Sequence, residues 1–167
     1  KEVSAYAACM IHKRIEVEDA AVAAVKYKSG AIGVIVGSTA MWPGNSIELH
    51  LTGEKGSAWL RGGNLVQWQF AEEKPEDGKI RTQFGPQDQP AGKGGASDPR
   101  AISFVGHQRQ FENFARAIAA KEKPMVDGAE ARKAVEVILG VYASALSGKA
   151  VKYPLKRTPK RRKFQKA

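Results

Sequence analysis

The sequence predicts an α+β fold, a two-layer sandwich in which helices cover one face of an open-faced, predominantly antiparallel sheet. Three observations support this prediction. Residues 17–63 read as extended segments separated by turns, two helical segments with one apolar stripe each lie towards the C-terminus, and 43% of the 167 residues are apolar. Because this length and composition suit one domain with a substantial core, we expect a single globular unit over residues 1–155.

The first half of the chain carries the strand signals. Residues 3–11 place an apolar side chain at every second position, which favours Cys9 as a buried thiol. Two apolar runs, residues 20–25 and 31–36, follow on either side of a turn at residues 28–30. The glycine of that turn supplies the positive φ that a tight hairpin needs. These residues therefore predict a strand followed by a β-hairpin.

Three further extended segments continue the meander. Residues 46–51 alternate Ile47, Leu49 and Leu51 with polar side chains, which is the period of a strand with one wet face. Glycine-rich turns then separate residues 57–60 from residues 65–70. The order of these segments predicts an antiparallel sheet ahead of the helices.

The middle of the chain is polar and rich in glycine and proline. Residues 71–97 predict a long loop, with space for a short strand over residues 79–84. Loops longer than about 12 to 15 residues tend to be functional or disordered. The loop therefore separates a β-rich half from a helical end.

Two helices and a short strand complete the fold. Apolar residues at helical spacing predict a helix over residues 106–121. Asp127 and Glu130 form a capping box that begins a second helix, which continues to a stop at residues 147–148. Residues 151–155 then predict an edge strand, where Pro154 is tolerated because an edge residue need not donate to the ladder.

One sheet face is left without a helical cover. Both registers of residues 20–25 are apolar, so water is a poor partner for the face opposite the helices. We therefore expect this face to form a homo-oligomer interface or a contact with another domain.

The net charge of +10 is concentrated at the C-terminus. Residues 156–167 hold seven Lys or Arg and no acid, which leaves +3 for the rest of the chain. Such a tail is more often a solvated end than a binding arm, so we do not expect a nucleic-acid partner. The single cysteine permits no intramolecular disulfide and favours a reducing, cytoplasmic setting. No apolar stretch reaches the roughly 18 residues that would span a membrane, and no membrane partner is expected.

The motifs of common chemistries are missing from the sequence. There is no G-x-G-x-x-G, phosphate-binding P-loop or G-x-S-x-G, and the three histidines are not spaced as metal ligands. We therefore assign no catalytic, cofactor-binding or metal-binding residue to this chain.

Two local constellations remain as candidate substrate-binding sites. His107 begins the first predicted helix, where it could donate to a hydroxyl or relay a proton, although a helix-start histidine bonded to a nearby carbonyl is the alternative. Trp42 could supply a flat apolar wall with Asn45 as a hydrogen-bonding neighbour. Its alternative is a turn whose tryptophan packs on the sheet or on a neighbouring subunit.

Several phrases of the sequence carry a resemblance to a known family. The phrases are VEDAAVAAVKYKSGAIGVIVGSTAMWPG, LTGEKGSAWLRGG and GHQRQFENFARAIAAKEKPMVDGAEARKAVEVILGVYASALSGKAVKYPL. In this order and spacing, they resemble the C-terminal domain of the Gfo/Idh/MocA family of NAD(P)-dependent oxidoreductases. The similarity runs from about Val3 to Leu155, which is nearly everything except the basic tail.

The resemblance implies how the chain would take part in catalysis. In that family an N-terminal Rossmann domain binds NAD or NADP, and the C-terminal domain shapes the site for a sugar, inositol or related polyol and mediates oligomers. The family's glycine-rich motif, Glu-Lys-Pro motif and Asp-x-x-x-His segment do not occur in this sequence. We therefore expect an isolated substrate-binding and oligomerisation domain, without the Rossmann domain and inactive by itself. The alternative is a stand-alone, non-catalytic scaffold module that self-associates through its sheet.

Overall fold

The computed structural model describes residues 1–86, 104–159 and 164. The chain forms two compact units, one made of residues 1–40 and 104–167 and the other of residues 41–103. This division corrects the expectation of a single globular unit. The physical reason is that the two predicted strand groups build two separate sheets, each with its own hydrogen-bonded ladder.

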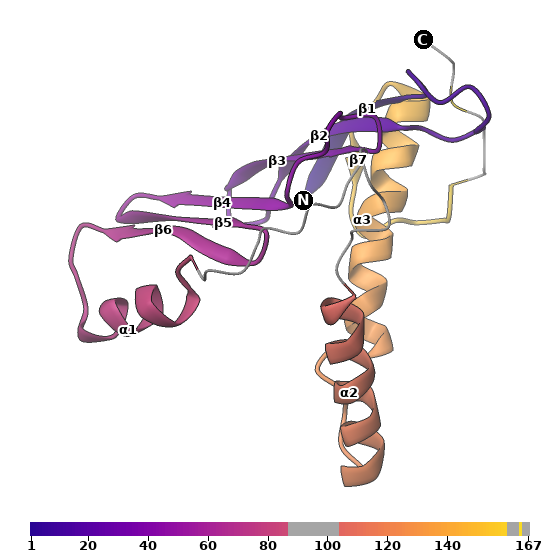
Figure 1. The fold of residues 1–167 in the computed structure, drawn as a ribbon. Helices are drawn as coiled ribbons and strands as arrows, with labels where there is room; N and C mark the ends of the chain where they lie inside the picture. Colours follow the sequence, from indigo (N-terminus) through magenta and orange to yellow (C-terminus); the bar gives the residue numbers. More distant parts are fainter. Residues whose placement is uncertain (87–103, 160–163, 165–167) are drawn as a thin grey trace. The chain divides into compact units, whose positions relative to one another are not determined.

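The first unit contains a four-stranded antiparallel sheet and two helices (Figure 1). Its sheet has the order β3-β2-β1-β7. The elements are β1 (Glu2–Ala8), β2 (Ala20–Lys26), β3 (Ile32–Ser38), α2 (Val105–Ala120), α3 (Gly128–Ser147) and β7 (Val151–Lys152). The predicted hairpin is confirmed, because the N–H of Tyr27 donates to the carbonyl of Ala31 at 2.8 Å and Gly30 has a φ of 93°.

Helix α3 begins and ends where its sequence signals predicted. The Asp127 carboxylate accepts the N–H of Glu130 at 2.9 Å, and Gly148 ends the helix in the left-handed region with a φ of 66°. The reciprocal half of the capping box does not form, since the Glu130 carboxylate pairs with Lys133 instead. The first unit's core lies between this helix and the sheet and contains Val3, Ala5, Ala23, Val25 and Val141.

A buried serine joins α3 to the edge of the sheet. Strand β7 pairs with β1 only at Glu2 and Val3, so the ladder on that side stops before Ala5. The N–H of Ala5 donates instead to Oγ of Ser144 at 2.9 Å, and this hydroxyl donates to the carbonyl of Lys149 at 2.9 Å. Ser144 is 1% exposed. One side chain thus satisfies two backbone groups that would otherwise lack partners in a dry environment.

A tyrosine lies across the only buried glycine of α3. The hydroxyl of Tyr153 donates to the carbonyl of Val137 at 2.8 Å, and a β-carbon at Gly140 would overlap the Tyr153 ring. Burial, followed by the nearby charge of Glu136, raises the pKa of Tyr153. Gly140 is therefore required for close packing, because only a residue without a side chain leaves space for the ring.

The sheet of the first unit leaves one face uncovered, as predicted. Residues that alternate with the core positions line up across the strands: Tyr6 opposite Val22 and Val36, and Ala24 opposite Val34. The apolar residues of the open face are Tyr6, Val22, Ala24, Ile32, Val34 and Val36, and Ser4 and Lys26 lie in register with them. Val34 is 70% and Ile32 83% exposed. One face of this sheet packs on α3 and the opposite face is open, which confirms the predicted open-faced sheet.

A buried carboxylate organises the loop between β1 and β2. The Asp19 side chain accepts the N–H groups of Met10, Ile11 and His12 at 2.7 to 2.8 Å. These backbone donors, those of Met10 and His12 above all, lower the pKa of Asp19 to about 2. Cys9 is buried beside this loop, as its alternating position predicted, with its Sγ 3.0 Å from the carbonyl of His12. The ionised Asp19 thus holds the loop in one conformation.

A second carboxylate connects the same loop to α3. The hydroxyl of Tyr142 donates to Oε1 of Glu18 at 2.6 Å. This hydrogen bond, assisted by burial, raises the pKa of Tyr142 to about 12. Tyr142 also lies 5.6 Å from the ring of Phe164, between ring centroids.

The second unit contains a three-stranded antiparallel sheet and one helix. Its elements are β4 (Glu48–Gly53), β5 (Gly56–Arg61), β6 (Asn64–Phe70) and α1 (Pro75–Phe84), and the sheet order is β4-β5-β6. The strands agree with the segments predicted from alternation and from the glycine turns, within about two residues.

Helix α1 corrects the prediction for the polar middle of the chain. Residues 75–84 are helical, so the long loop predicted over residues 71–97 is wrong there, and so is the short strand over residues 79–84. Pro75 occupies the first turn, and the Asp77 carboxylate accepts the N–H of Lys74 at 2.7 Å and that of the Trp68 indole at 2.8 Å. These two donors lower the pKa of Asp77. Residues 87–97 of the predicted loop lie outside the described residues.

Candidate functional site

The turn after β3 brings two of the three predicted site residues together. Trp42 and Asn45 flank Pro43 and Gly44, where Gly44 has a φ of 107° and the Trp42–Pro43 peptide is cis. The Asn45 amide donates only to Sδ of Met41, at 3.6 Å. Trp42 is 82% exposed, so its indole does not pack on the sheet of its own unit. The turn thus presents a flat apolar surface and an amide to the solvent.

His107, the third predicted residue, belongs to the other unit. It occupies the first turn of α2, a helix whose N-cap residue Phe104 makes no side-chain cap hydrogen bond. Its side chain is exposed and makes no hydrogen bond within the described part of the chain. At helical spacing it continues a stripe of exposed apolar residues: Phe111, Phe114 and Ile118. The structure therefore places His107 on an apolar helix face.

Sequence analysis missed an ionic and aromatic cluster on the sheet of the second unit. The ring of His50 stacks on Trp59 with centroids 4.7 Å apart, and the guanidinium of Arg61 lies 4.4 Å from the Trp59 ring centre. Glu48 accepts hydrogen bonds from His50 at 3.1 Å and from Arg61 at 2.7 Å. The bonds from His50 and then from Arg61 lower the pKa of Glu48. His50 is therefore part of an ordered network on the surface of this sheet.

The register of the strands explains why the cluster was missed. His50 pairs with Trp59 across β4 and β5, and Glu48 pairs with Arg61, although they are 9 and 13 residues apart. Alternation predicted only that Glu48 and His50 share a face. No sequence signal specified which residues of β5 would lie opposite them.

The same sheet face carries further hydrogen-bonding groups. The amide of Gln67 donates to Oγ of Ser57 at 2.7 Å and to the Gln69 amide oxygen at 3.1 Å. The indole nitrogen of Trp59 is buried and has no partner in the described part of the chain. This arrangement can bind polar ligands but has no group placed for nucleophilic catalysis. Among the described residues, no three His, Cys, Asp or Glu side chains gather as metal ligands.

Comparison with known proteins agrees with the fold described above. Residues 1–59 match the model of the GFO/IDH/MocA C-terminal domain, which confirms the resemblance inferred from sequence. No match was found among curated proteins. No helix of the described residues is long and apolar enough to cross a membrane.

Solved structures resemble the chain over almost its whole length. The WlbA dehydrogenase from Bordetella pertussis, in complex with NADH and UDP-GlcNAcA, matches 93% of this chain at 28% identity with a TM-score of 0.73. The WlbA dehydrogenase from Chromobacterium violaceum, with the same two ligands, matches 94% at 27% identity with a TM-score of 0.71. A levoglucosan dehydrogenase shares the fold, with 92% coverage, 20% identity and a TM-score of 0.65. The chain spans 42%, 41% and 45% of these three proteins, respectively.

Proposed function

We propose that this chain is the substrate-binding and oligomerisation domain of an NAD(P)-dependent oxidoreductase acting on a sugar, inositol or related polyol, because its residues 1–59 match the GFO/IDH/MocA C-terminal domain. The observation that carries this proposal is the likeness over 93% of the chain to a dehydrogenase bound to NADH and a nucleotide sugar. The sequence contains no dinucleotide-binding motif, so we assign no cofactor site to this chain and expect it to be inactive alone. In the whole enzyme, the nicotinamide would exchange a hydride with a carbinol carbon of the substrate.

The proposed role of this chain in catalysis is to position the substrate. The exposed indole of Trp42 would pack against the C–H face of a sugar ring, and the Asn45 amide can both donate to and accept from its hydroxyls. In the other unit, the exposed His107 imidazole could by itself donate to a hydroxyl. None of these contacts forms or breaks a covalent bond of the substrate, so they contribute binding and orientation rather than a chemical step.

Replacing Trp42 with alanine should weaken sugar binding. We expect saturation transfer from the 167-residue chain to the sugar-ring protons of UDP-GlcNAcA to fall by at least roughly threefold in Trp42→Ala, because the ring loses its stacking surface. Phe84→Ala, which removes a half-exposed aromatic ring from the same unit, is the matched control and should leave the transfer unchanged. Equal transfer to wild type and Trp42→Ala would remove Trp42 from the proposed site.

The open face supports the proposed oligomerisation. Six side chains from three neighbouring strands expose an apolar surface that has no charged residue at its centre. A soluble protein rarely leaves such a patch in water, and the same patch on a second copy is a self-complementary partner under two-fold symmetry. We therefore propose a homo-oligomer that buries the open face.

A charge on the open face should dissociate the oligomer. We expect the wild-type chain to sediment as an oligomer at micromolar concentration, and Val34→Glu to sediment as a monomer, because a buried unpaired carboxylate in each copy costs several kcal/mol. Ile118→Glu places the same charge at a similarly exposed apolar residue of α2 and should leave the oligomer intact. A folded wild-type chain that remains monomeric at tens of micromolar would contradict this part of the proposal.

A further inference from the structure

We infer that a groove between the end of α3, β7 and the C-terminal tail is a binding site for a small diphosphate ligand, and best fits a nucleoside diphosphate. The groove encloses about 760 Å³. This volume lies within the usual range of small-molecule sites, roughly 300 to 1,000 Å³. All of its lining residues belong to the first unit.

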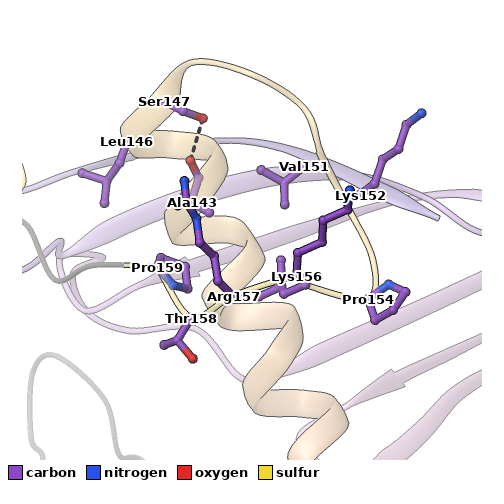
Figure 2. A pocket seen from close by; sticks show the side chains of 11 residues that line it. Ala143, Leu146, Ser147, Val151, Lys152, Pro154, Lys156, Arg157, Thr158 and Pro159 are labelled. Atoms are coloured by element: carbon purple, nitrogen blue, oxygen red, sulfur yellow. Dashed lines mark hydrogen bonds between the residues drawn. The ribbon is translucent and has the colours of Figure 1, made fainter.

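The groove has one basic side and one apolar side. Its cations are Lys152 of β7 and Lys156 and Arg157 of the tail. Figure 2 shows the Lys156 side chain extending towards Lys152 and the Arg157 side chain extending towards Ala143. The apolar lining consists of Ala143, Leu146, Val151, Pro154, Leu155 and Pro159. Ser147 and Thr158 add hydroxyl groups.

Among the described residues, no acidic side chain forms an ion pair with any of the three cations. In the parts of the chain that are described, none of the ion pairs or side-chain hydrogen bonds involves Lys152, Lys156 or Arg157. No acidic residue lines the groove. Glu136 approaches the tail, but its carboxylate accepts the N–H of Leu155 at 2.7 Å and is not among the lining residues. Three like charges on one concave surface favour a multivalent anion.

The competing explanation is that the tail cations neutralise the negative end of the α3 dipole. Near the end of α3, the Ala143 carbonyl accepts a hydrogen bond from Ser147 Oγ at 2.7 Å, and the Ser144 carbonyl accepts the N–H of Gly148 at 2.9 Å. Dipole effects are worth less than about 1 kcal/mol at exposed sites and need only one cation. The dipole therefore does not account for three cations around one groove.

The two sides of the groove determine the ligand class. Lysine and arginine bind phosphate oxygens, with arginine able to do so in a bidentate manner. The aliphatic and proline walls would cover an uncharged, flat group next to the phosphates. A nucleoside diphosphate has both parts, whereas free pyrophosphate satisfies only the basic side. The inference rests on the groove alone and does not require the dehydrogenase function proposed above.

Calorimetric titration of the 167-residue chain tests this site. We expect UDP to bind more tightly than inorganic pyrophosphate, and uridine to give no detectable heat. The Lys156→Gln/Arg157→Gln variant should weaken UDP binding by at least about tenfold, because two charge-assisted contacts are lost. Lys28→Gln/Lys123→Gln removes two exposed cations that do not line the groove, and it should bind UDP within about twofold of wild type.

Four results would contradict the inference. UDP binding that weakens equally in the two double variants would indicate general attraction to a basic protein. If deletion of residues 160–167 abolished UDP binding although all groove residues remained, the anion would bind to the deleted residues and not to the groove. Absence of UDP binding at millimolar concentration would exclude the site, while the oligomer test remains independent of this result. A pyrophosphate affinity equal to that of UDP would restrict the site to the phosphates and refute the apolar half of the inference.

Discussion

Gly140→Ala is expected to destabilise the first unit by about 2 to 4 kcal/mol, which is a large share of the stability of a small domain. The added methyl group would occupy the position of the Tyr153 ring. Tyr153 would have to move away, giving up both its contact with α3 and its hydrogen bond to the carbonyl of Val137. The higher helix propensity of alanine returns only about 1 kcal/mol. Urea denaturation followed by far-UV circular dichroism measures the difference.

Two further variants make this result specific. Gly106→Ala adds a methyl group in α2, where no heavy atom lies within 4 Å, and should be neutral or slightly stabilising. Gly140→Ala/Tyr153→Leu removes the ring that the methyl group would strike, so its loss of stability should be smaller than the sum of the two single variants. Wild-type stability in Gly140→Ala would show that the tyrosine does not lie across the helix.

Ser144→Ala is expected to lower the free energy of unfolding by about 2 to 4 kcal/mol. The serine hydroxyl accepts from Ala5 and donates to Lys149, and alanine leaves both backbone groups without partners in a site where the side chain is 1% exposed. An unsatisfied buried polar group costs about 1 to 3 kcal/mol, so the effect of two exceeds that of an ordinary core serine. The cavity left by one oxygen is too small to add much.

Ser147→Ala is the matched control for this prediction. It removes the same hydroxyl at the last residue of α3, where the side chain is exposed and donates to carbonyls of its own helix, at 2.7 Å to that of Ala143. We expect a change within about 0.5 kcal/mol. Hydrogen exchange at Ala5 gives a second measurement, since its amide should lose protection in Ser144→Ala and keep it in Ser147→Ala. Equal stability of the two serine variants would refute the proposed role of Ser144.

The accuracy of the sequence predictions followed the range of the interactions that determine each element. Helix α3 was predicted within one residue at each end, because Asp127 and Gly148 act on backbone groups only a few residues away. The hairpin at Gly30 was predicted for the same reason. Helix α1 was missed although its cap is also local, since glycine and proline around residues 75–85 outweighed the signal of Pro75 and Asp77. Its apolar periodicity is weak, and a contact with Trp68 supports it instead.

The candidate site shows the same distinction. Trp42 and Asn45 are three residues apart, so the sequence could place them in one turn, but it could not determine that the indole would be exposed. The cluster of His50, Trp59 and Arg61 depends on the pairing of β4 with β5. Strand register is set by the whole sheet and its turns, and alternation alone leaves it open.

The sequence by itself determined the fold class, the apolar sheet face left open by the helices, the caps of α3 and the resemblance to the GFO/IDH/MocA C-terminal domain, which a family match then confirmed. Each of these follows from local periodicity, from caps or from the order of phrases. Only the tertiary structure decided that the strands form two sheets, that Ser144 replaces a missing ladder partner for Ala5, and that three cations of β7 and the tail line one groove. The physical reason is that these features join residues up to 139 positions apart, and packing rather than local preference determines which of them meet.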